Sequence, residues 1–335
     1  MSVQDTLTQS DESIILTKGL TKRYKDTIAV DNLNLKIKKG EVFGLLGPNG
    51  AGKTTTTLML LGLTEPDAGQ AFINKIDCTK NSLEVKKQVG YLPDNVGFYP
   101  DMTGRENLRF IGKLNGLDGS SLEEQIDRLL NRVGMAKAAD KKTQTYSRGM
   151  RQRLGIADVL MKNPQVIIMD EPTLGIDPEG IRELMALIRE LAEKDGRTLL
   201  ISSHQLYQIQ KVCDRMGIFV KGKLVAHGTL EELGQQINNG GVNTIELSVY
   251  PENVKLKNLL DNMEGILELQ KQNEYYVIRS GYDIRRKLSK LLMENGYTIM
   301  LLRPAGSDLD EIYRQYFEKA GETDAGSKRK KISRA

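Results

Sequence analysis

The chain of 335 residues contains a glycine-rich segment with the pattern Gly-x4-Gly-Lys-Thr. A short apolar run, 42–46, precedes it and a helical pattern, 53–63, follows, as where a buried parallel strand feeds a helix. Glycines let backbone N–H groups wrap a phosphate, the helix N-terminus adds positive potential, Lys53 would neutralise phosphate charge, and Thr54 would offer its hydroxyl to Mg²⁺. We therefore predict nucleotide-phosphate binding rather than a glycine turn before a core helix. The predicted contacts are Gly47, Pro48, Asn49, Gly50, Ala51, Gly52, Lys53, Thr54 and the adjoining Thr55.

A second apolar run, 166–169, ends in two carboxylates, Asp170 and Glu171. Ligands in open α/β sheets lie beyond the carboxyl ends of the strands, so this pair falls where a nucleotide would bind. Asp170 would hold Mg²⁺, and Glu171 would orient or deprotonate the attacking water. Alone, the run could equally be a strand that enters an acidic turn. Together with the glycine-rich segment, it predicts hydrolysis of the nucleotide.

Shortly before that run stands Tyr146-Ser147-Arg148-Gly149-Met150, which resembles the signature motif of the ABC ATPases. About residues 13–235 are similar to a complete ABC nucleotide-binding domain. The features follow in the same order: glycine-rich segment, helical insert, signature, acidic pair, the loop 174–177 and a histidine at a strand end. In that family two domains pair head to tail, and the signature of one completes the ATP site of the other. The resemblance implies that the chain binds ATP and Mg²⁺. It also implies that Ser147 and Gly149 contact the γ-phosphate held by a partner.

The same resemblance implies further nucleotide contacts. Tyr24 occupies the place of the aromatic residue that stacks on adenine, which adds affinity with little selectivity among bases. His204, 33 residues after Glu171, would reach the γ-phosphate and the catalytic water. Asp177 of the loop 174–177 is included among the nucleotide contacts. The ordinary alternative for Tyr24 is a tyrosine on a strand, and for His204 a partly buried histidine at a strand edge. His227 follows a hairpin pattern and is expected at the surface.

The chain departs from the family at two places. After the strand pattern 89–92 the family commonly has Gln, which touches Mg²⁺, water and the transport partner, and this chain has Asp94. Asp94 keeps an oxygen that can bind Mg²⁺, brings a charge and lacks the amide donor. The signature reads Tyr-Ser-Arg-Gly-Met in place of Leu-Ser-Gly-Gly-Gln, with Ser147 and Gly149 retained. Both variants resemble the ATPase subunits of type 2 ABC exporters, which move drugs, lipids, polysaccharides or ions outward.

The first domain, 13–235, is predicted to be α/β, with a mostly parallel sheet, an antiparallel β subdomain and an inserted helical subdomain at about 95–163. Residues 13–40 read as short strands and turns, and 103–163 read as helical throughout. Capping boxes are predicted at Thr103/Glu106 and Ser121/Glu124, and the signature helix is predicted to open at Arg151. Strands of the parallel sheet are predicted at 42–46, 166–169, 198–202 and 216–220, with a helix at 179–194 between the second and third.

A polar segment that ends in glycines, 236–242, reads as a linker. The patterns after it follow the order βαββαβ of a small ferredoxin-like α+β domain, 243–320, closed by a helix at 308–320. The segments 1–12 and 321–335 read as a polar tail and a basic, flexible tail. The second domain is predicted to have strands at 244–250, 266–270, 275–279 and 297–302 and helices at 252–263 and 283–295.

Composition narrows the class of protein. Hydrophobic residues make up 39% of the chain and charged residues 27%, as in ordinary globular proteins. No apolar run approaches the roughly 18 residues of a membrane span, and the polar, acidic N-terminus is unlike a signal peptide. Five basic residues lie in the last ten, which contain no acid, so the rest of the chain has a net charge of −1. We expect a cytoplasmic protein with no nucleic-acid partner, in which Cys78 and Cys213 are buried thiols rather than zinc or disulfide ligands.

The leading hypothesis is an ATP-binding and ATP-hydrolysing subunit that powers an ABC membrane exporter. It would act as a homodimer or with a paired ATPase subunit, and lie at the inner face of the cell membrane through integral membrane permease subunits. A soluble ABC ATPase that acts on ribosomes or DNA is the alternative, although such proteins usually carry tandem ATPase domains, long coiled coils or zinc cysteines. A regulatory module without turnover is disfavoured because Lys53, Asp170, Glu171 and His204 are all present.

Overall fold

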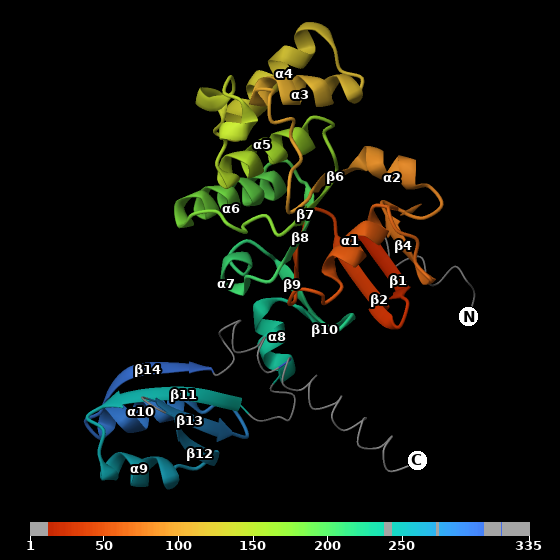
Figure 1. Ribbon diagram of the computed structural model, residues 1–335. Helices are drawn as coiled ribbons and strands as arrows, with labels where there is room; N and C mark the ends of the chain where they lie inside the picture. The colour runs from red at the N-terminus through yellow and green to blue at the C-terminus, as the bar shows by residue number, and fades with distance from the viewer. Residues whose placement is uncertain (1–12, 238–242, 273–274, 305–315, 317–335) are drawn as a thin grey trace. The chain divides into compact units, whose positions relative to one another are not determined.

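A computed structural model of the chain describes residues 13–237, 243–272, 275–304 and 316 (Figure 1). The chain divides into two compact units between His227 and Gly228, and each is described by itself. We predicted that boundary at 235; the structure differs because helix α8 (Leu230–Ile237) belongs to the second unit. The predicted linker 236–242 is therefore wrong in its first two residues, which are helical. Residues 238–242 and the tails 1–12 and 321–335 lie outside the described residues.

Four strands near the N-terminus form an antiparallel sheet in the order β2-β1-β4-β5. The predicted alternation is confirmed, since Leu33, Leu35 and Ile37 are buried and the residues between them are exposed. The expectation of short strands is wrong: β1 and β2 each have 12 residues. The hydroxyl of Thr17 supports the irregular register between them by donating to the Leu33 carbonyl and accepting from the Leu35 N–H. The strands are β1 (Ser13–Tyr24), β2 (Thr27–Lys38), β4 (Ala68–Ile73) and β5 (Ile76–Asp77).

A six-stranded sheet in the order β10-β9-β3-β8-β7-β6 forms the centre of the first unit. From β9 to β6 every neighbouring pair is parallel, and β3, β7 and β8 are buried along their whole length, which explains their continuous apolar runs. Helix α1 contacts β2, β4 and β7, so it packs between the two sheets. These elements confirm the mostly parallel α/β class. They are β3 (Val42–Leu46), α1 (Lys53–Leu60), β6 (Val89–Leu92), β7 (Val166–Asp170), α6 (Pro178–Glu193), β8 (Thr198–Ser203), α7 (Leu206–Ile209), β9 (Arg215–Val220) and β10 (Lys223–Gly228).

The inserted helices α3 and α4 lie together at one end of the first unit (Figure 1). The capping box Thr103/Glu106 is confirmed. The box at Ser121/Glu124 is wrong, because Asp118 is the N-cap of α4 and Ser121 lies inside the helix, where its hydroxyl donates to the Asp118 carbonyl. The helices are α2 (Ser82–Gln88), α3 (Gly104–Leu114), α4 (Gly119–Arg132) and α5 (Arg148–Leu160), with 3-10 turns η1 (Ala136–Ala138) and η2 (Thr143–Thr145).

The segment between α4 and α5 is not helical throughout, contrary to the prediction. Tyr146 is extended and buried, and its hydroxyl donates to the Ala138 carbonyl at 2.6 Å, which holds the chain away from a helical path. Helix α5 begins at Arg148 rather than at Arg151. Ser147 is its N-cap, because the Ser147 hydroxyl accepts the Met150 N–H.

The second unit confirms the predicted order βαββαβ. Its sheet is antiparallel in the order β12-β13-β11-β14, the ferredoxin-like arrangement, and its core contains Leu247, Ile278 and Leu288. Of the helix predicted at 308–320 only Tyr316 is described. The elements are β11 (Asn243–Tyr250), α9 (Val254–Asp261), β12 (Ile266–Gln272), β13 (Tyr275–Ser280), α10 (Arg285–Glu294) and β14 (Thr298–Pro304).

Within 13–237, 243–272 and 275–304, none of the helices has the length and apolar character needed to span a membrane. Cys78 is buried as predicted, and burial raises the pKa of its thiol to about 12. Cys213 is partly buried, and burial also raises its pKa.

Candidate active site

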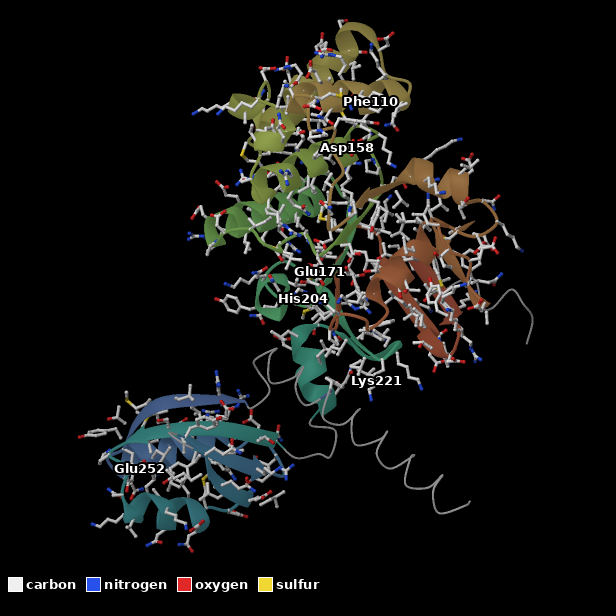
Figure 2. The ribbon with its side chains drawn as sticks, in the orientation of Figure 1. Phe110, Asp158, Glu171, His204, Lys221 and Glu252 are labelled. Carbon is white, nitrogen blue, oxygen red and sulfur yellow. The ribbon has the colours of Figure 1, made fainter. Side chains whose placement is uncertain are left out.

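The carboxyl ends of β3, β6, β7 and β8 meet at one edge of the parallel sheet and border a cavity of about 500 Å³. Figure 2 shows Glu171 and His204 close together at this edge. The cavity brings together most of the predicted site. Its lining contains Pro48, Asn49, Gly50, Ala51, Gly52, Lys53, Thr54, Thr55, Asp94, Asp170, Glu171 and His204 from the prediction, together with Ala29 and Leu174.

The glycine-rich segment forms one wall because its backbone turns where a side chain would not fit. Gly52 has φ +109°, and a Cβ there would lie 2.2 Å from the carbonyl oxygen of Ala29. Gly52 is the N-cap of α1 and supplies no capping side chain. The first backbone N–H groups of a helix have no partner within the helix, so the wall presents donors and the positive helix end to an anion.

The Lys53 side chain is buried beneath this wall. Its Nζ donates to the carbonyl oxygens of Gly47, at 2.6 Å, and Pro48, at 3.2 Å. It also lies 3.4 Å from Oε1 of Glu171. The ammonium group is therefore held at the bend of the segment, next to the space that phosphates would occupy.

Thr54 and Asp170 supply two oxygens on the opposite side of that space. Thr54 Oγ1 donates to Asp170 Oδ2 at 2.9 Å, and the Ser202 hydroxyl donates to the other oxygen, Oδ1. A hydroxyl and a carboxylate are the hard ligands that Mg²⁺ takes when it also binds phosphates. The part of the chain that the structure describes has no cluster of three or more His, Cys, Asp or Glu side chains suited to a metal. The Thr54 hydroxyl and the Asp170 carboxylate fit a Mg²⁺ ion that would also bind nucleotide phosphates.

Glu171 has a constrained position at the end of β7. Its φ is +48°, a left-handed conformation that costs energy for a residue with a side chain and that occurs often at functional sites. Oε2 lies 2.9 Å from His204 Nδ1 and accepts from the Ser203 hydroxyl at 3.3 Å. Oε1 is buried and has no hydrogen-bond partner, apart from the Lys53 charge nearby. Glu171 thus keeps one carboxylate oxygen without a hydrogen-bond partner, next to the Lys53 ammonium.

Asp94 lines the cavity, but its carboxylate is already engaged. Arg148 Nη2 donates to Asp94 Oδ1 at 2.5 Å. Tyr91 on the same strand responds to the local charges: burial raises the pKa of its hydroxyl to about 12, assisted by the negative charges of Asp170 and Asp94.

Five predicted contacts do not line the cavity of this single chain: Tyr24, Gly47, Ser147, Gly149 and Asp177. Tyr24 is 47% exposed at the end of β1, with the Lys22 ammonium 5.5 Å from its ring centre. Ser147 and Asp177 are exposed N-caps of α5 and α6. His227 is exposed, as predicted.

Sequence reasoning missed four residues of the site. Ala29 lines the cavity through a contact that no motif indicates, and Leu174 begins the loop 174–177 but was not itself predicted as a contact. Ser202 donates to Asp170 and Ser203 to Glu171, and a signal for them existed. They end the apolar run 199–201 beside His204, at the edge where the other strands place their polar residues.

Comparison with known proteins agrees with this geometry. The family model for the ABC transporter matches residues 30–174. The chain is 35% identical over 302 residues to the bacitracin transport ATP-binding protein BcrA of Bacillus licheniformis, which covers 90% of this chain and 96% of the relative. It is 36% identical over 236 residues to the linearmycin resistance ATP-binding protein LnrL of Bacillus subtilis (strain 168), which covers 70% and 75%.

Solved structures show the same likeness for the first unit. The dimeric post-hydrolysis ATP-binding cassette MJ0796, bound to ADP and Pi, is similar with a TM-score of 0.60 at 26% identity, over 64% of this chain and 98% of that one. The structure of cbiO1 from Clostridium perfringens, part of the ABC transporter complex cbiONQ, has a TM-score of 0.61 at 28% identity, over 69% and 96%. With these relatives and the phosphate-binding edge described above, the chain belongs to the ABC transporter family as an ATP-binding, ATP-hydrolysing subunit.

Proposed function

We propose that this subunit hydrolyses Mg²⁺-bound ATP in the cavity at the edge of the parallel sheet, as one half of a head-to-tail dimer that powers export through separate permease subunits. One observation carries the proposal. Glu171, which lines the cavity, is anchored by His204 through Oε2, while its Oε1 lies buried beside Lys53 without a hydrogen-bond partner. A carboxylate held in this way can accept a proton from a water that attacks a phosphate.

Lys53, Thr54 and Asp170 would serve the phosphate end, with Ser202 in support. Lys53 would neutralise the β- and γ-phosphate charge, exchanging its hydrogen bond to the Gly47 carbonyl for one to phosphate. Thr54 and Asp170 would hold Mg²⁺, which when bound neutralises phosphate charge. Ser202 holds Asp170 in place, so the carboxylate is oriented before nucleotide arrives.

Glu171 would act as general base and His204 as its positioning partner. An ionised carboxylate only accepts hydrogen bonds, so Nδ1 of His204 carries the hydrogen that it shares with Oε2. This contact leaves Nε2 as the ring atom that can face the γ-phosphate. Asp94 is a candidate third oxygen for Mg²⁺ on the grounds of its place in the cavity.

The cavity of one chain lacks several of the predicted nucleotide contacts, and this supports a dimer. Ser147 and Gly149 lie outside the cavity, and Ser147 is exposed at the N-terminus of α5, where a hydroxyl and the helix end could meet a phosphate on another copy. Tyr24 offers an exposed ring for adenine, and Asp177 would contribute from the loop before α6. The partner would be a second copy or a paired ATPase subunit.

Export is supported by the relatives, whose names refer to bacitracin transport and linearmycin resistance. We infer that the subunit lies on the cytoplasmic side of the cell membrane, bound to integral membrane permease subunits. Residues 13–227 would form the ATPase domain. The ferredoxin-like unit, in whose described part we find no phosphate loop or metal cluster, would serve contact or regulation.

Light scattering after size-exclusion chromatography tests the dimer. Glu171→Gln protein with Mg²⁺-ATP should elute at twice the mass found without nucleotide, and Glu268→Gln, a change in the second unit, should remain monomeric under turnover. A monomer at saturating ATP and high protein concentration would overturn the dimer. Copurification from membranes tests the permease: an integral membrane partner is expected, and ribosomes or DNA in its place would favour the soluble class.

A further inference from the structure

An ion pair joins the loop after β6 to the first residue of α5. Arg148 Nη2 donates to Asp94 Oδ1 at 2.5 Å, across 54 residues of sequence. Asp94 lines the nucleotide cavity, whereas Arg148 stands between Ser147 and Gly149, outside it. The pair is thus a direct contact between the cavity and the signature segment of the same chain.

Arg148 also contacts the loop between β7 and α6. Gly175 has φ +70°, and a Cβ at that position would lie 2.8 Å from Cδ and 3.3 Å from Nε of Arg148. The arginine side chain therefore fills the space where residue 175 would otherwise carry a side chain. One arginine links the start of α5 with two loops that each supply a residue, Asp94 or Leu174, to the cavity lining.

The charges of the pair favour this arrangement at the start of α5. A cation at a helix N-terminus faces the positive end of the helix dipole, which is unfavourable, and a nearby carboxylate offsets that cost. The guanidinium of Arg148 and the carboxylate of Asp94 carry opposite charges and lie in contact.

The Asp94–Arg148 pair adds little to the stability of the whole protein. The side chains of Arg148 and Asp94 are 43% and 48% exposed, and ion pairs with this exposure contribute little to the free energy of unfolding. A contact of this kind can nevertheless fix an orientation, because it adds a second tether to a helix start that the Ser147 cap also holds.

We propose that Asp94 acts through Arg148 as a positioning pair that holds the first turn of α5, with Ser147 and Gly149, in register with the nucleotide cavity of its own chain. This inference rests on the proposed function, in which Ser147 and Gly149 meet ATP on a partner. It assigns Asp94 a role other than the Mg²⁺ ligand considered above. The two roles predict different results in a double-mutant cycle: coupled effects for a positioning pair, and independent losses for a metal ligand.

The cycle uses the full chain as wild type, Asp94→Asn, Arg148→Glu and the double variant. Arg148→Glu places two carboxylates together, so we expect kcat for ATP to fall about tenfold, while Arg148→Lys stays within about threefold of wild type. In the Asp94→Asn background the repulsion is gone, and Arg148→Glu should change kcat by less than about twofold. KM for ATP and the half-saturating Mg²⁺ concentration should stay within about twofold throughout. The matched control is Arg279→Glu, which reverses a similarly exposed pair with Glu268 in the second unit and should leave kcat unchanged.

Amide hydrogen exchange requires no ATP hydrolysis, so it tests the Asp94–Arg148 pair independently of the proposed function. In nucleotide-free protein, Arg148→Glu should speed amide hydrogen exchange at 148–151 by about threefold or more when residue 94 is Asp, and not when it is Asn. Two results would overturn the proposed pair and make Asp94 a metal ligand. One is that the losses of kcat from the two single variants multiply in the double variant. The other is that Asp94→Asn raises the Mg²⁺ requirement whichever residue stands at 148. If wild type fails to hydrolyse ATP, the proposed function fails, and the exchange cycle alone decides the pair.

Discussion

Nδ1 of His204 lies 2.9 Å from Oε2 of Glu171, although the two residues are 33 apart in the chain. They meet because β7 and β8 are parallel neighbours whose register pairs Asp170 with Ser202, one and two residues before the site. The contact fixes which nitrogen of the imidazole carries hydrogen and which carboxylate oxygen is left without a hydrogen-bond partner. The geometry of the site thus follows from strand register as much as from residue identity.

We predict that His204→Ala lowers kcat for ATP by about a hundredfold, since Glu171 loses the partner that orients it. ATP affinity should change little, because the phosphate charge is met by Lys53. His204→Gln, which can still donate to Oε2, should recover part of the loss. Steady-state hydrolysis and calorimetry check this; a His204→Ala protein with unchanged kcat would show that the contact is incidental.

Lys53→Ala should weaken ATP binding by roughly tenfold to a hundredfold, the effect of removing a charge-assisted contact of about 1.5–3 kcal/mol. Isothermal calorimetry measures the affinity, and Lys287→Ala in the second unit is the control. Thermal unfolding must accompany it, because the change also removes the cation beside the buried Oε1 of Glu171. Equal affinity in the variant and wild type would contradict the role assigned to Lys53.

The wall of the cavity provides a steric prediction. Gly52→Ala would place a Cβ 2.2 Å from the Ala29 carbonyl oxygen in a backbone conformation, φ +109°, that suits only glycine. Gly50→Ala meets no atom within 4 Å, so it carries only the left-handed strain of about 1–2 kcal/mol. Chemical denaturation should therefore show a clearly larger loss for Gly52→Ala than for Gly50→Ala. Equal losses would contradict the close approach of β2 to the segment.

Asp158 on α5 (Figure 2) gives a pH-dependent prediction. Burial raises the pKa of this carboxyl to about 6, and the charge of Lys162 acts against the rise. A raised folded-state pKa contributes stability that is present at low pH and is lost as pH rises through the folded value. Asp158→Asn should therefore unfold like wild type near pH 4 and be more stable above pH 6, by at most about 3 kcal/mol. Thermal melts at pH 4.5 and 7.5 compare them, and a difference that shrinks with rising pH would show that the folded-state pKa is not raised.

Buried parallel strands were the part of the fold that sequence predicted best. The runs at β3 and β7 are apolar throughout because both faces of the sheet are covered, and polar residues follow where each strand ends. The side chains of Lys53, Asp170 and His204 could therefore be placed at one edge.

Features that depend on tertiary contacts were not predictable in this way. Helix α5 begins three residues earlier than expected because Ser147 caps it, and Ser121 fails as a cap because Asp118 precedes it in an extended conformation. Ala29 enters the cavity lining only because β2 passes behind the glycine-rich segment, which no local pattern records. The Asp94–Arg148 pair likewise required the structure, since neither residue signals the other in sequence.

The central claim is that Glu171 is the base for ATP hydrolysis, and steady-state hydrolysis by Glu171→Gln tests it most directly. The amide keeps the shape of the side chain but cannot take a proton from water, so turnover should fall by at least about a hundredfold while ATP affinity by calorimetry stays within threefold of wild type. Glu268→Gln, with its exposed side chain in the second unit, should hydrolyse ATP at the wild-type rate. Hydrolysis by Glu171→Gln within about tenfold of wild type, a barrier change of only ~1.4 kcal/mol, would contradict the account.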